Sequence, residues 1–152
     1  MKIDGKTYSF QPAILESPFA GDKRTNRIFA ENIVKAKLHQ GFNCFASHLY
    51  YPHFLDDDVP EERAMGIAAG LQWANGIMQV FFALPEWLDV PSKGMRLAYD
   101  WHRECNRNIH CGIYNMEGAC RLMIPEEDFF SNDGWIVYLK NQQEAKQRRS
   151  DA

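Results

Sequence analysis

The stretch GIMQVFFAL, residues 76–84, decides the fold class because it is a nearly continuous apolar run. A strand that is apolar on both faces is typical of a parallel sheet covered by helices on each side. Pro85 and the segment 86–94, which is rich in proline and small residues, end the run in a loop. The stretch therefore predicts a buried strand in an α/β sheet.

Helical and strand patterns alternate on both sides of this strand. Helices are expected at 24–41, 60–75 and 95–108, and further strands at the start of 10–22, at 42–52 and at 109–114. This order predicts an α/β fold, a flavodoxin-like or Rossmann-like open parallel sheet of about four to five strands flanked by helices. Ligands bind such sheets outside the carboxyl ends of the strands, where the connection order reverses. That rule selects four loops: 17–26, 47–59, 84–94 and 114–118.

Local signals place the ends of these elements. Thr25 or Asn26 is expected to cap the first helix and Gly41 to end it. Pro60 suits the first turn of the second helix, where two glutamates follow at a position that the helix dipole favours. Phe29 and Trp73, at helical spacing, are expected in the core.

The C-terminal part is less regular. PEED, residues 125–128, can begin a helix, and Trp135, Val137 and Leu139 form a possible edge strand or packed segment. The last dozen residues are polar and are expected to be frayed. We therefore expect one α/β domain, residues 1–140, followed by a polar tail, residues 141–152.

Composition argues against several classes of protein. With 17 lysines and arginines against 20 aspartates and glutamates, the formal net charge is −3, and the basic residues form no stripe, so nucleic acid is an unlikely partner. The apolar runs are too short to span a bilayer and no secretory segment opens the chain, so we expect no membrane and a cytoplasmic protein. The four cysteines form no C-x-x-C pair, which favours free thiols over a structural metal.

Several motifs, taken in order, resemble a known superfamily. They are SPFAGD followed by TN after the first strand, ASHLYYP after the second, ERAMGIAAGLQWA on the second helix and SKGM at the third. This chain resembles the nucleoside 2-deoxyribosyltransferase-like superfamily, and within it a branch of small bacterial and phage proteins. The resemblance spans roughly residues 12–114. It implies a flavodoxin-like fold, a homodimer or larger homo-oligomer, and a nucleoside or nucleoside monophosphate as ligand.

The two carboxylates that the resemblance implies for catalysis are missing. Catalytic members cleave or transfer the N-glycosidic bond with a glutamate after the S-x-G turn and an aspartate on the preceding helix. The matching positions hold Ala98 and Gly70. The reaction passes through an oxocarbenium-like centre that a carboxylate traps or stabilises, which neither alanine nor glycine can do.

Two functions therefore stay open. The preferred one is binding of a nucleotide or nucleoside-derived small molecule without glycosidic chemistry, as a sensor or sequestering protein; a phage could use such a protein against host defence, in the host cytoplasm. The alternative is an N-glycosidase or deoxyribosyltransferase acting on (deoxy)nucleosides or their monophosphates. It would recruit Asp57, Asp100 or a carboxylate of a neighbouring subunit, although Asp100 is expected to face solvent.

Candidate ligand contacts come from the loops at the expected binding edge. Asp22 and Asn26 could instead cap the first helix, and the turn at Ser92–Gly94 offers free N–H groups. The trio Asp56–Asp58 could contact ribose hydroxyls, bind Mg²⁺ or cap the second helix, and no other cofactor is expected. The candidates are Ser17, Pro18, Phe19, Gly21, Asp22, Asn26, Ser47, His48, Asp56, Asp57, Ser92, Gly94 and Met95.

Overall fold

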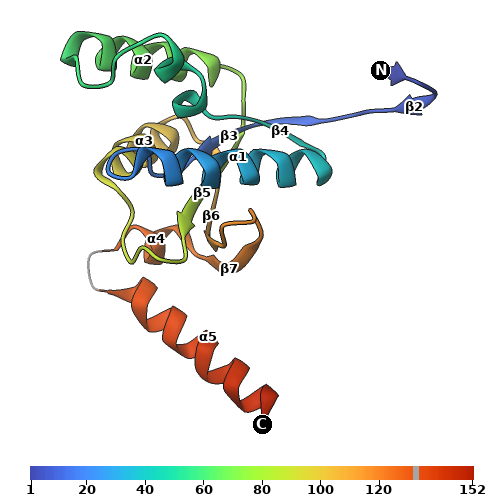
Figure 1. Cartoon of the computed structure of the whole chain (residues 1–152), viewed down its shortest axis with the longest axis vertical. Coiled ribbons are helices and arrows are strands. Elements are labelled where there is room, and N and C mark those ends of the chain that lie inside the picture. Colours follow the sequence, from blue (N-terminus) through green and yellow to red (C-terminus); the bar gives the residue numbers. More distant parts are fainter. Residues whose placement is uncertain (132–133) are drawn as a thin grey trace.

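The computed structural model describes residues 1–131 and 134–152, and it confirms the expected α/β fold. Three helices connect the parallel strands: α1 (Lys23–His39), α2 (Pro60–Trp73) and α3 (Lys93–Glu104). The main sheet has the order β4-β3-β5-β6-β7 and is open (Figure 1). Its strands are β3 (Gln11–Glu16), β4 (Phe42–Phe45), β5 (Gln79–Pro85), β6 (Asn108–Tyr114) and β7 (Cys120–Ile124), of which only β7 runs antiparallel to its neighbour.

Strand β5 is buried on both faces, as its apolar run predicts. Its side chains alternate between two cores, because successive residues of a strand point to opposite faces. Phe82 packs in one core with Met95 and other residues of α3. Phe81 packs in the other core with Phe29 of α1. The sheet therefore has α1 on one face and α3 on the other.

The first helix begins one turn earlier than the sequence indicates. Asp22 is its N-cap, because its carboxylate accepts hydrogen bonds from the backbone N–H of Thr25 (3.1 Å) and from the Thr25 hydroxyl (2.8 Å). The caps expected at Thr25 or Asn26 are therefore wrong. Gly41 follows the helix with a φ of 89°, which confirms it as the residue that ends α1.

Strand β4 is shorter than predicted and ends at Phe45 rather than near residue 52. Two single-turn 3₁₀ helices follow, η1 (Ser47–Leu49) and η2 (Tyr51–His53). β4 is an edge strand whose last pair with β3 is Ile14 with Phe45, so the chain beyond it has no partner strand. The chain folds back instead into the region beside α2.

Helix α2 begins at Pro60 with two glutamates in its first turn, as predicted, but it packs loosely. None of its residues is buried. Trp73, expected in the core, is 57% exposed and stacks on Phe45, with ring centroids 5.2 Å apart. Phe29, also expected in the core, is completely buried, which confirms that half of the prediction.

The C-terminal part differs from the expectation. The edge of the sheet is β7, and residues 135–139, expected as an edge strand or packed segment, begin helix α5 (Trp135–Asp151). The PEED motif does begin a helix, α4 (Glu126–Phe129). The polar residues expected to be frayed continue α5 to Asp151, and α5 extends away from the sheet (Figure 1).

The N-terminal residues form a small hairpin of β1 (Lys2–Ile3) and β2 (Lys6–Thr7) that also extends from the body (Figure 1). All of these residues are exposed. Within residues 1–131 and 134–152, no helix is both long and apolar enough to span a membrane.

Candidate functional site

A cavity of about 390 Å³ opens at the carboxyl ends of β3 and β4, between α2 and α3. The connection order reverses at this place, because β4 and β5 lie on opposite sides of β3. Three of the four predicted loops contribute to its lining, through residues 17–20, 47–57 and 92–94. The loop 114–118 does not, because it follows β6, further along the sheet.

The walls of the cavity are mostly apolar. Leu97 of α3 and Ile67 of α2 are 65% and 51% exposed, although both are large hydrophobic residues. Exposed apolar side chains around a cavity are typical of a site that receives a ligand with an apolar part. The other large apolar lining residues are Phe19, Phe45, Tyr51, Leu55, Leu71, Met95 and Trp101.

One carboxylate, Glu16, lines this cavity from the last position of β3. Its Oε1 lies 2.9 Å from Nε2 of His102, a residue of α3 that is completely buried. Nη1 of Arg107 lies 3.0 Å from Nδ1 of the same imidazole. A guanidinium can only donate, so Nδ1 accepts, and the proton of a neutral His102 resides on Nε2 and is donated to Glu16. His102 therefore orients the Glu16 carboxylate.

Arg107 is itself fixed by the chain around it. Its Nε donates to the carbonyl of Ile77 and its Nη2 to the carbonyl of Ala74, both at 3.0 Å. The guanidinium also stacks over the Trp101 ring, 4.2 Å from the centroid. Within the described parts of the chain, the second oxygen of Glu16, Oε2, has no hydrogen-bond partner. The site thus presents one rigidly held carboxylate with a free oxygen.

A second polar pair lies beside Glu16. Ser17 Oγ and His48 Nε2 are 2.8 Å apart, and both residues line the cavity. Burial lowers the pKa of His48, while the nearby charge of Glu16 acts in the opposite direction. The His48 imidazole is therefore neutral at pH 7 and can either accept from Ser17 or donate to it.

Helix α3 begins at the cavity, as its small-residue turn predicts. Ser92 is the N-cap, and its Oγ accepts from the backbone N–H of Met95 at 3.2 Å. Gly94, Met95 and Ala98 line the cavity together with Ser92. The first amides of α3 are thus turned toward the space in which a ligand would lie.

Gly70 of α2 also lines the cavity, but it has no room for a side chain. A Cβ built there would lie 2.7 Å from Cβ of Ser47, closer than carbon atoms approach in proteins. In this arrangement α2 cannot carry an aspartate at that position. The cavity therefore lacks a carboxylate at both Gly70 and Ala98.

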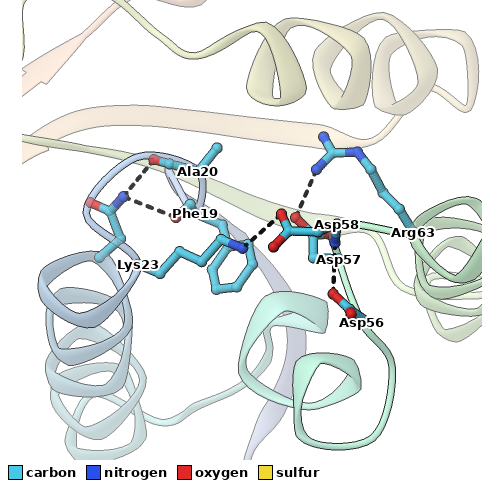
Figure 2. Close-up of polar contacts among 8 residues, drawn as sticks. Phe19, Ala20, Lys23, Asp56, Asp57, Asp58 and Arg63 are labelled. Atoms are coloured by element: carbon cyan, nitrogen blue, oxygen red, sulfur yellow. Dashed lines mark hydrogen bonds and ion pairs between the residues drawn. The ribbon is translucent and has the colours of Figure 1, made fainter. Parts of the chain in front are cut away.

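The acidic loop between η2 and α2 is held by ion pairs (Figure 2). Asp57 accepts from Nη1 of Arg63 at 2.8 Å, and Asp58 lies 3.5 Å from Nζ of Lys23. Asp56 Oδ1 accepts from the backbone N–H of Asp58 at 2.9 Å. The N-cap of α2 is Val59, without a side-chain bond, so the expectation that this trio caps α2 is wrong.

The three aspartates also do not form a metal site. Across residues 1–131 and 134–152, no group of three or more His, Cys, Asp or Glu side chains is arranged to hold a metal ion. Asp57 lines the cavity, whereas Asp56 and Asp58 do not.

Other candidates lie outside the cavity lining and support the structure around it. Asn26 is buried and donates through Nδ2 to the carbonyls of Phe19 (3.2 Å) and Ala20 (3.0 Å), which fixes the loop after β3 (Figure 2). The two hydrogen bonds from Thr25 lower the pKa of the Asp22 carboxyl. The candidates that do not line the cavity are Pro18, Gly21, Asp22, Asn26, Asp56 and Asp100. Asp100 is exposed, as expected.

Sequence reasoning missed the pair Glu16 and His102. The signal for Glu16 is a charged residue at the very end of the apolar run AIL, residues 13–15, where a parallel strand delivers side chains to the binding edge. His102 shares the buried face of α3 with Met95 and Tyr99, where a polar residue needs a partner.

Comparison with known proteins gives one match. No curated protein matches the chain. A family model described as "Domain of unknown function (DUF7768)" matches residues 11–112, from the first residue of β3 into β6. The matched region contains every residue that lines the cavity, from Ile14 to His102. The match covers well over half of the chain, and the chain therefore belongs to the DUF7768 family.

Proposed function

We propose that this protein binds a nucleotide or nucleoside-derived small molecule in the cavity, without cleaving a glycosidic bond. The observation that carries the proposal is one oriented carboxylate, Glu16, set among apolar walls at the point where the strand order reverses. The protein then acts as a sensor or sequestering protein, as a phage could use against nucleotide signals of host defence.

The dimensions and lining of the cavity support this proposal. Its volume of about 390 Å³ lies in the range of about 300–1,000 Å³ found for small-molecule sites. Aromatic and aliphatic side chains suit the faces of a base, and Glu16 suits the hydroxyl groups of a sugar. The start of α3 offers backbone N–H groups toward which a phosphate could be directed.

The absence of carboxylates where the resembling enzymes need them also supports binding without catalysis. Ala98 has no functional group, and Gly70 has no space for one. The substitutes named from the sequence are poorly placed, since Asp57 is paired with Arg63 and Asp100 is exposed outside the cavity.

Glu16 itself favours a second candidate function. An ionised carboxylate in a cavity could serve as the nucleophile of an N-glycosidase or deoxyribosyltransferase acting on nucleosides or their monophosphates. The two functions differ in one observable, which is the release of free base.

Two assays with purified protein test these proposals. Thermal unfolding is measured with nucleosides, nucleoside monophosphates, cyclic nucleotides and ADP-ribose. A ligand of the native state present at 100 times its Kd adds about 2.7 kcal/mol of stability and raises Tm. If none of these compounds raises Tm, binding in the cavity is refuted. In parallel, chromatography of deoxynucleosides and their monophosphates after incubation should show no free base; base release that Glu16→Gln abolishes and Asp100→Asn preserves would instead establish the enzyme.

A further inference from the structure

We propose that Glu16 selects ligands that carry two neighbouring sugar hydroxyl groups, so that the site recognises a ribose rather than a deoxyribose. This inference rests on the proposed function and names the substrate class of the same cavity. It is carried by three properties of Glu16: its orientation, its charge balance and its free oxygen.

Orientation comes first. His102 is completely buried and accepts from Arg107, so its Nε2–H can only be aimed at Oε1 of Glu16. Arg107 in turn is held by two backbone carbonyls and by the Trp101 ring. A carboxylate fixed through such a chain of bonds is ready for its ligand without further loss of side-chain freedom.

The charge balance decides which kind of ligand group faces Glu16. Glu16 carries −1, the imidazole of His102 is neutral and Arg107 carries +1, so the three groups together are neutral. A neutral group that donates hydrogen bonds is therefore sufficient in front of the carboxylate. A phosphate placed there would meet the carboxylate directly, whereas Arg63 and Lys93 line other parts of the cavity.

The free oxygen sets the number of donors. Oε1 already accepts from His102, while Oε2 accepts nothing from the described residues, so the carboxylate can still take two or more hydrogen bonds. Two hydroxyls on neighbouring carbons can donate to one carboxylate at the same time. Ser17, the next residue along the chain, lines the same cavity and offers a hydroxyl to the sugar.

The test compares ligands that differ only in these hydroxyls. The four common ribonucleosides and their 2′-deoxy, 3′-deoxy and 2′,3′-dideoxy counterparts are titrated by calorimetry into the wild-type chain, Glu16→Gln and Asp100→Asn. The wild type should bind the dideoxy compound about 10- to 100-fold more weakly than the ribonucleoside, because hydrogen bonds to a charged acceptor are lost. Each singly deoxygenated compound should fall between the two.

The variants assign this preference to Glu16. In Glu16→Gln the ratio of the two affinities should fall to within about threefold, whereas Asp100→Asn, which changes an exposed carboxylate of the same helix, should keep the wild-type ratio. Equal binding of the ribonucleoside and dideoxynucleoside by the wild type would overturn the inference while leaving the proposed function intact; this comparison needs no variant to fold. An undiminished preference in Glu16→Gln would also overturn it. Failure of every nucleoside and nucleotide to bind would remove the proposed function itself.

Discussion

The crossover helices α1 and α2 leave the neighbouring strands β3 and β4, yet they meet the rest of the molecule differently. α1 buries Phe29, Ala30 and Ile33 completely against the sheet. α2 buries none of its residues, and its Ile67 and Trp73 remain more than half exposed. One helix therefore seals its face of the sheet, and the other stands apart and leaves a cavity. In this molecule the loosely packed helix provides the site.

The composition of α2 explains its position. Its contacts use small residues: Gly66 lies against Tyr51 and Leu55, and Gly70 against Ser47. These contacts place α2 on the 3₁₀ segments after β4 and keep it off the sheet. The space between α2 and α3 is then available for a ligand.

The largest difference between the two helices should appear in stability. Replacing the fully buried Phe29 of α1 by alanine should lower the free energy of unfolding by about 3–5 kcal/mol, because it creates a cavity in a sealed core. The matched change Ile67→Ala on α2, at a side chain 51% exposed, should cost less than about 1 kcal/mol. Urea denaturation measures both. Similar losses would show that α2 packs as tightly as α1.

The same contrast explains what could be predicted from the sequence. Phe29 and the strand at 76–84 were predictable because their burial follows from local periodicity. The exposure of Trp73 was not, since its helical spacing says nothing about whether the helix reaches the sheet. The loops 17–26 and 47–59 could be placed at the cavity from topology alone. The bond between Glu16 and His102 could not, because it joins residues separated by 86 positions.

Arg107 tests how α2 is held without a core of its own. It donates to the carbonyl of Ala74, the C-cap of α2, and to that of Ile77. Arg107→Met should therefore lower the free energy of unfolding by about 2–3 kcal/mol, since two partly buried carbonyls lose a charged donor. Arg24→Met, at an exposed position of α1, should change it by less than about 0.5 kcal/mol. Equal effects of the two substitutions in urea denaturation would refute this account of α2.

The two glycines of α2 give a closer test of its seat. Gly70→Ala should destabilise the protein by about 1–2 kcal/mol, because the new Cβ would lie 2.7 Å from Cβ of Ser47 and α2 must shift. Gly66→Ala meets its nearest atoms at 3.5 Å, an ordinary contact, and should stabilise the helix by up to about 1 kcal/mol. Thermal unfolding of both variants measures the difference. If Gly70→Ala is as stable as Gly66→Ala, α2 does not sit as close to η1 as described.

The smallest effect concerns one histidine on each side of the sheet. Burial lowers the pKa of His48 beside the cavity; burial, followed by the charge of Lys37, lowers that of His110, which stacks on Phe81 in the α1 core. Below about pH 6.5 the unfolded chain then binds more protons than the folded one, so stability should fall as the pH falls from 7 toward 5. His48→Gln and His110→Gln should each make this fall less steep, as measured by the free energy of unfolding at several pH values. A ligand in the cavity should steepen the fall if it needs neutral His48, and it should do so in His110→Gln but not in His48→Gln. An equal response of the two variants to the ligand would show that His48 does not face the bound molecule.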